Sequence, residues 1–122
     1  MSQNELDDGL PVREAGRWTE DKLAIVRDYL RAFGRACSKR APTFYFADAF
    51  SGPGINRFRD TGELVLGSPL LALESDPAFA KCLLMDLGDQ NVRTLEARTA
   101  RYEERVVVRK GDCNVDLIPA MR

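Results

Sequence analysis

The hydrophobic residues of this chain first follow a helical pattern and then fall into short uninterrupted runs. From about residue 19 to residue 36 they recur every three or four positions, which predicts an amphipathic helix. Thr19 is expected to be its N-cap, and Trp18, just before the cap, a packing anchor. The packed face of this helix is expected to comprise Leu23, Val26, Leu30 and Phe33. Residues 1–17 are polar and without a clear period, so we expect a loosely held lead-in there and a folded domain over 18–122.

Three apolar runs predict β-strands. The run Thr43–Asp48 carries no charge before its last residue, so we expect a strand that is buried on both faces. A second run, Cys82–Asp86, also ends in an acid, and the β-branched Val106–Val108 forms the third strand. Between the first two strands, Ser68 is expected to be the N-cap of a short helix, and a longer helix covers about residues 90–102.

The order of these elements indicates the fold class. Helix, strand, helix, strand, helix and strand make one βαβαβ half of a doubly wound α/β protein. We therefore expect a partial Rossmann-like sheet of three parallel strands in the order 3-2-1, preceded by an N-terminal helix. The stretch 55–66 after the first strand loses the apolar period and is expected to be an exposed loop. A sheet of three strands has open edges, so self-association through such an edge is one expectation.

A glycine-bracketed turn follows the first predicted strand. Gly52 and Gly54 let the backbone turn sharply and approach a ligand without a Cβ atom in the way. A turn of this kind, at the carboxyl end of a parallel strand, is where α/β sheets bind nucleotide-like ligands. The segment Ser51-Gly52-Pro53-Gly54 lacks the third glycine of the dinucleotide signature, which disfavours a nucleotide-dependent oxidoreductase. The chain also has no phosphate-binding loop of the nucleoside triphosphatase type.

An aspartate lies at or shortly after the end of each of the three predicted strands. Asp48 and Asp86 end the first two runs, and Asp112 follows the third. With neighbouring strands about 4.8 Å apart, the three carboxylates would line roughly 10 Å of one sheet edge. A carboxylate at such an edge can accept hydrogen bonds from both hydroxyls of a ribose. The alternative is that each aspartate caps the helix or turn that follows it. The ordered set of acids, together with the glycine turn, favours a ligand site.

Composition narrows the class of protein. The chain has 122 residues, 44% of them hydrophobic, which fits one small globular domain. A net charge of −1 gives no global attraction to nucleic acid, so a nucleic-acid partner stays open but without support from charge. The longest apolar runs are too short for a membrane span, and no signal peptide is recognisable. A basic stripe on the first helix is expected to be a solvated face, and it comprises Arg27, Arg31, Arg35 and Lys39.

Cysteine and histidine usage excludes several kinds of chemistry. The chain has no histidine, which removes serine–histidine catalysis and histidine-ligated metals. Its cysteines, Cys37, Cys82 and Cys113, are odd in number and match no zinc motif, so we expect no metal. Such spacing fits a reducing cytoplasm better than a disulfide framework.

Four segments of the chain together carry a family resemblance. They are Trp18 with Lys22, the stretch 45–54, Gly67-Ser68-Pro69, and the stretch 111–114. In this arrangement the chain resembles the three-Cys-motif partner family, whose members have a Rossmann-like, methyltransferase-type fold. The resemblance implies S-adenosylmethionine as cofactor. The family is named after a neighbouring gene whose product bears a three-cysteine motif, so it also implies a three-Cys-motif protein as partner.

Carried over residue by residue, the resemblance implies a cofactor site but no catalytic residue. Asp48, Gly52 and Gly54 would face the methionine part of the cofactor, Asp86 would hold the ribose, and Asp112 would lie near the adenine. The full implied set is Asp48, Phe50, Ser51, Gly52, Gly54, Ser68, Asp86 and Asp112. One departure is Met85-Asp86, because the family more often has isoleucine and glutamate there.

The family's proteins continue beyond the position of Arg122 with further strands and a substrate-binding region. We therefore expect the amino-terminal half of a methyltransferase-like protein, with little or no methyl transfer by itself. The alternative is a non-enzymatic interaction protein that reuses the fold and docks a partner in its pocket. The open sheet edge and the basic stripe motivate that alternative.

Overall fold

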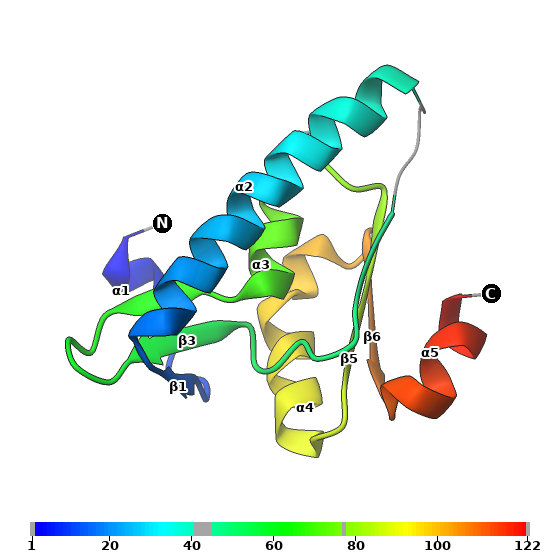
Figure 1. Ribbon diagram of the computed structural model, residues 1–122. Helices are drawn as coiled ribbons and strands as arrows, with labels where there is room; N and C mark the ends of the chain where they lie inside the picture. The colour runs from blue at the N-terminus through cyan, green and yellow to red at the C-terminus, as the bar shows by residue number, and fades with distance from the viewer. Residues whose placement is uncertain (1, 41–44, 77, 122) are drawn as a thin grey trace.

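The chain forms an α/β structure with two small sheets (Figure 1). The computed structural model describes residues 2–40, 45–76 and 78–121. One sheet contains β2 (Tyr45–Asp48), β5 (Lys81–Asp86) and β6 (Val106–Lys110). The other contains β1 (Arg13–Ala15), β3 (Ile55–Phe58) and β4 (Leu64–Leu66).

The β2–β5–β6 sheet is parallel throughout, with β5 in the middle. The predicted strand order 3-2-1 is therefore confirmed. Its register pairs Asp48 with Leu84 and Asp86 with Lys110, so the carboxyl ends of the three strands meet at one edge. The backbone N–H of Gly111 donates to the carbonyl oxygen of Asp86 at 3.1 Å and joins the chain beyond β6 to the end of β5.

Helices cover one face of this sheet. On that face lie α2 (Arg17–Arg40), α3 (Ser68–Leu73) and α4 (Asp89–Arg98), and the 3₁₀ turn η1 (Ala100–Tyr102) follows α4 (Figure 1). The core fills the space between them, with Cys82 and Leu84 from β5 against Leu95 from α4, all fully buried. The helix α5 (Cys113–Met121) was not predicted from the sequence, and it lies across the sheet from the other helices (Figure 1). No helix within the described residues has the length and apolarity to cross a membrane.

The first turns of α2 differ from the prediction. The helix begins at Arg17, so Thr19 lies inside its first turn and the predicted N-cap is wrong. Trp18 is 70% exposed and does not anchor any packing. The reason is that α2 packs against α3 further along its length, while its first turn extends beyond α3 toward β1 (Figure 1).

The rest of α2 follows the predicted pattern in part. Leu30 is buried and Leu23 and Val26 are half-buried, whereas Phe33 is exposed. The basic stripe is solvent-exposed, as predicted, at Arg27, Arg31, Arg35 and Lys39.

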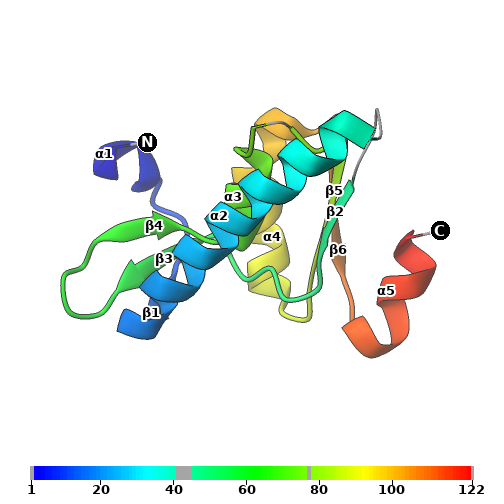
Figure 2. The ribbon, with the colours of Figure 1, turned by 45° about the horizontal axis from the view of Figure 1, so that its top comes forward.

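The expected loop over residues 55–66 is instead a β-hairpin. Ile55, Phe58 and Leu64 are buried at 3%, 6% and 5% exposure, because β3 pairs with β4 in antiparallel fashion and with β1 in parallel fashion. Figure 2 shows this hairpin projecting from the body of the molecule beside the start of α2. Its strands have three or four residues each, too few to display a period-two pattern in the sequence.

The amino-terminal segment, expected to be a loosely held lead-in, contains two elements. The short helix α1 (Gln3–Leu6) buries Leu6 in the core, and β1 follows it. The side-chain amide of Gln3 bonds both backbone groups of Leu64, donating to the carbonyl at 2.8 Å and accepting from the N–H at 2.7 Å. These contacts attach the segment to the β3–β4 hairpin.

Strand β2 is not buried on both faces. Phe46 packs on Phe79 with ring centroids 5.4 Å apart, but Tyr45 is 67% exposed. The prediction failed because β2 lies at the edge of the sheet, α2, α3 and α4 cover only the side of Phe46, and α5 on the other side leaves Tyr45 exposed. The first residues of the predicted strand, Thr43 and Phe44, lie outside the described residues.

Candidate functional site

Asp86 occupies the point where the strand ends meet. It is the last residue of the central strand β5 and is 8% exposed. Its Oδ1 accepts the backbone N–H of Gly88 at 2.9 Å and the side-chain amide of Asn91 at 3.0 Å, and its Oδ2 accepts the backbone N–H of Gly52 at 2.9 Å. Burial by itself would raise the pKa of Asp86, but these hydrogen bonds outweigh it and lower the pKa. The carboxylate is therefore charged at neutral pH.

The glycine turn bends sharply, as predicted from its sequence, and its glycines are needed both for the backbone conformation and for packing. Gly52 and Gly54 have φ of +63° and +91°, in the left-handed region that favours glycine. The N–H of Ser51 donates to the carbonyl oxygen of Met85 at 3.0 Å and ties the turn to β5. A Cβ added at Gly54 would lie 3.3 Å from Leu95, so this glycine faces the core.

Arg13 is a neighbour of the turn that sequence reasoning missed. Its guanidinium lies against Gly52, where an added Cβ would come within 2.6 Å of Nη2. Its charge also contributes to lowering the pKa of Asp86. Gly52 therefore lies between an arginine from β1 and a carboxylate from β5. The polar pattern of the residues before α2 gave no signal that they reach the glycine turn.

Asp48 and Ser68 are brought together next to the turn. Asp48, half-buried at the end of β2, accepts the backbone N–H of Phe50 on Oδ1 at 3.0 Å. Its Oδ2 accepts the hydroxyl of Ser68 at 2.5 Å. Ser68 is the first residue of α3 and its N-cap is Gly67, so the prediction of Ser68 as N-cap is wrong. The Ser68 hydroxyl binds Asp48 instead of the helix backbone.

The other predicted site residues differ widely in environment. Ser51 is buried and donates its hydroxyl to the carbonyl oxygen of Asp48 at 3.0 Å. Phe50 is 72% exposed, so its ring is available to a ligand. Asp112 is exposed and accepts the N–H of Asn114 at 2.9 Å, in the first turn of α5. Its carboxylate thus serves as a helix cap, the structural alternative considered from the sequence.

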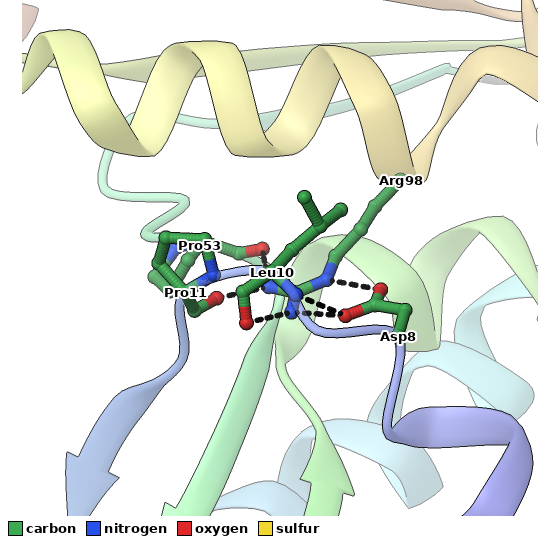
Figure 3. Close-up of polar contacts among 5 residues, drawn as sticks. All are labelled: Asp8, Leu10, Pro11, Pro53 and Arg98. Atoms are coloured by element: carbon green, nitrogen blue, oxygen red, sulfur yellow. Dashed lines mark hydrogen bonds and ion pairs between the residues drawn. The ribbon is translucent and has the colours of Figure 1, made fainter.

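A second polar centre holds the glycine turn from its other side (Figure 3). Arg98, the last residue of α4, has a side chain that is only 2% exposed. Its guanidinium donates to both carboxylate oxygens of Asp8 at 2.8 Å, and to three backbone carbonyls, those of Leu10, Pro11 and Pro53, at 2.6–3.0 Å. All five N–H groups of the side chain are used. Arg98 thereby joins the amino-terminal segment to the glycine turn.

Neither a metal site nor a reactive thiol at Cys82 finds support within the described residues. Histidine, cysteine and acidic side chains form no group of three or more that could hold a metal ion, among the residues the structure describes. The thiol of Cys82 is buried in the core, and burial raises its pKa to about 11, so it is not poised as a nucleophile.

Comparisons with known protein families, with curated proteins and with solved structures find no match for this chain.

Proposed function

We propose that this chain binds S-adenosylmethionine, as the amino-terminal, cofactor-binding part of a methyltransferase-like protein of the three-Cys-motif partner type. The observation that carries the proposal is the position of Asp86. It is a buried, charged carboxylate at the carboxyl end of the central parallel strand, bonded to a glycine turn from the neighbouring strand. Open α/β sheets bind adenosine-containing ligands at this point of the fold.

The residues at the strand ends fit the adenosyl group in chemistry. A carboxylate offers about four acceptor positions, and Asp86 uses three of them on protein groups. The position left on Oδ2 suits one ribose hydroxyl. The exposed ring of Phe50 provides an apolar surface beside the turn. The cofactor would supply a methyl group on a sulfonium centre, and the protein's own residues would bind and orient it.

Calorimetric titration with S-adenosylhomocysteine tests the proposal on the purified, monodisperse chain. We expect a dissociation constant in the range of roughly 1–100 μM, equivalent to about 5.5–8 kcal/mol. Phe50→Ala and Asp86→Asn should each weaken binding. Phe50 is exposed, so its variant is expected to keep the fold. Asp89→Asn is the matched control, because Asp89 is an exposed acid three residues from Asp86. A folded chain that binds no S-adenosylhomocysteine contradicts the proposal.

A non-enzymatic interaction protein is the second candidate function, and one observation favours it. On the side of the parallel sheet away from the core, apolar side chains of β2, β5 and β6 line a shallow cavity of about 470 Å³ that includes Tyr45, Leu83 and Val107. Here docking would use the sheet and not Asp86. Asp86→Asn should then leave association unchanged, while Tyr45→Lys should weaken it in sedimentation velocity at rising concentration.

A further inference from the structure

A cavity of about 330 Å³ lies where the start of α2 meets β1, β3 and the glycine turn. This volume is within the range of small-molecule sites, roughly 300–1,000 Å³. Four of the predicted cofactor residues, Phe50, Ser51, Gly54 and Ser68, line it, whereas the three strand-end acids Asp48, Asp86 and Asp112 do not. The cavity is therefore on the Arg13 side of Gly52, whereas the strand-end carboxylate is bonded to the same glycine through its N–H.

Positive charge dominates the lining of this cavity. Arg13, Lys22 and Arg59 line it, against a single acid, Glu14. None of the three cations forms an ion pair among residues 2–40, 45–76 and 78–121. This local excess does not follow from the chain as a whole, which has a net charge of −1. A cavity with unpaired cations favours an anionic ligand.

The side-chain amide of Asn56 also lines the cavity. Asn56, in the middle of β3, is 9% exposed, and its side chain has no hydrogen bond in the described part of the chain. Its Nδ2 lies 3.3 Å from where a Cβ on Gly67 would be, and Gly67 lines the cavity too. No fully buried side-chain polar atom of the described residues lacks a hydrogen-bond partner, so the amide of Asn56 is open to the cavity. A ligand in the cavity can form a hydrogen bond with it.

Two exposed aromatic rings border the same cavity. Trp18 and Phe50, from the first turn of α2 and the turn after β2, are 70% and 72% exposed. Large exposed aromatic side chains beside cations are the surfaces on which nucleic-acid bases stack. The sequence alone predicted Trp18 as a packing anchor. In the structure the indole ring is exposed, and the Lys22 ammonium lies 6.0 Å from the centre of the ring, so a base that contacts Trp18 would also lie beside a cation.

We propose that this cavity binds a nucleotide unit, with the base against Trp18 or Phe50, the phosphate near Arg13, Lys22 and Arg59, and a polar edge on Asn56. The unit could belong to a free nucleotide or to a single strand of nucleic acid, since both present a base and a phosphate. The inference goes beyond the proposed function, because S-adenosylmethionine has no phosphate and because nucleotide binding here does not need the cofactor.

Trp18 is the only tryptophan of the chain, so its fluorescence reports on this cavity directly. The intact chain is titrated with thymidine, inorganic phosphate, thymidine 5′-monophosphate and an eight-residue oligothymidylate. Thymine is a sufficient base for these probes, because stacking on aromatic rings tolerates every base. We expect quenching by the monophosphate, by the oligonucleotide or by both, and much weaker effects of thymidine or phosphate alone. Tighter binding of the oligonucleotide identifies a strand as the source, and equal binding identifies the free nucleotide.

Arg59→Ala provides the matched test of the cavity's charge. Arg59 is exposed, so its replacement should keep the fold. It should weaken quenching several-fold, and it should reduce by about 1 the slope of log affinity against log salt concentration. Arg31→Ala, an exposed arginine of the basic stripe on α2 outside the cavity, should change neither. Absence of quenching, equal affinity for thymidine and its monophosphate, or equal effects of Arg31→Ala and Arg59→Ala would each overturn the inference.

Three further measurements separate this inference from the proposed function. Asp86→Asn should leave nucleotide quenching unchanged, and Arg59→Ala should leave binding of S-adenosylhomocysteine unchanged. Competition between S-adenosylhomocysteine and the monophosphate would mean that the cavity is the cofactor's own, and would overturn the assignment of a separate nucleotide site.

Discussion

Replacing Arg98 by methionine tests how much the buried arginine contributes to the fold. Methionine keeps much of the aliphatic volume but removes the charge and all five donors, so the Asp8 carboxylate and three carbonyl oxygens lose their partner. Breaking a buried ion pair from one side costs about 3–5 kcal/mol. The side chain of Asp8 is 31% exposed, so water can replace part of what is lost. We therefore expect a loss near the lower end, about 3 kcal/mol.

This loss is large against the stability of the whole chain. At about 0.05–0.15 kcal/mol per residue, a chain of 122 residues unfolds with roughly 6–18 kcal/mol. The assay is urea unfolding followed by far-ultraviolet circular dichroism. With a slope of about 1–3 kcal/mol per molar urea, the midpoint should fall by roughly 1–3 M. Asp8→Asn and the double variant complete a cycle in which we expect a coupling of about 1.5–3 kcal/mol.

Arg93→Met is the control for helix propensity and surface charge. Arg93 is an exposed arginine of the same helix, and its replacement should change the free energy of unfolding by no more than about 0.5 kcal/mol. If Arg98→Met were as mild as Arg93→Met, or if the cycle gave no coupling with Asp8, the guanidinium would not be holding the amino-terminal segment. The contacts in Figure 3 would then have no energetic role.

Three titrating groups give further predictions. The pKa of Asp8 is lowered chiefly by its hydrogen bonds with Arg98, and that of Asp86 is lowered because its hydrogen bonds outweigh burial. Their contribution is present above the unfolded pKa and is lost as pH falls through the folded one, so the urea midpoint should drop below about pH 4, and less steeply in Asp8→Asn. Burial raises the pKa of Cys82 from 9.0 to about 11, so it should carry about 100-fold less thiolate than an exposed thiol and react with a thiol reagent mainly after unfolding. The native state, in which the thiol stays neutral, should keep its full contribution to stability below pH 9.0 and lose it as pH rises toward about 11. Urea midpoints of the wild type and of Cys82→Ala over this pH range check the prediction.

The parallel sheet could be predicted because its signal is local and strong. The runs 82–86 and 106–108 are apolar, β-branched or both, and each is followed by a polar turn. Strand order then follows because strands that are consecutive in the sequence usually lie next to each other, and the structure has that order. Asp48 and Asp86 were also predictable in position, since each is the first charge of its run, whereas Arg109 and Lys110 come before Asp112.

The β1–β3–β4 sheet could not be predicted because its strands are short and its pairing is long-range. Arg13 pairs with Asn56, more than forty positions apart, and neither strand has an alternating pattern. A pattern over three or four residues does not distinguish a strand from a loop. The cavity was missed for the same reason, because its lining residues meet only through this pairing.

The role of Arg98 was missed although its position carried a signal. It lies three residues after Leu95 on the buried face of α4, where a charged residue is unusual. Helical periodicity alone would therefore have marked Arg98 as a buried cation in need of partners. What it could not supply is the identity of those partners, since three of them are backbone carbonyls in two separate segments.

The glycine turn is held by contacts from three directions, and this links stability to binding. The N–H of Gly52 binds Asp86, the carbonyl of Pro53 accepts from Arg98, and the guanidinium of Arg13 packs on Gly52. Asp86 is the last residue of β5 and Arg98 is the last residue of α4, the helix that follows it. Arg13, in contrast, comes from the amino-terminal segment. That segment is itself fixed to Arg98 through Asp8 and two carbonyls, only two to five residues before Arg13. A change at Asp8 should therefore shift Arg13, which lines the cavity, together with the glycine turn that Asp86 binds. Ligand binding in the cavity and at Asp86 should then both depend on residues that touch no ligand.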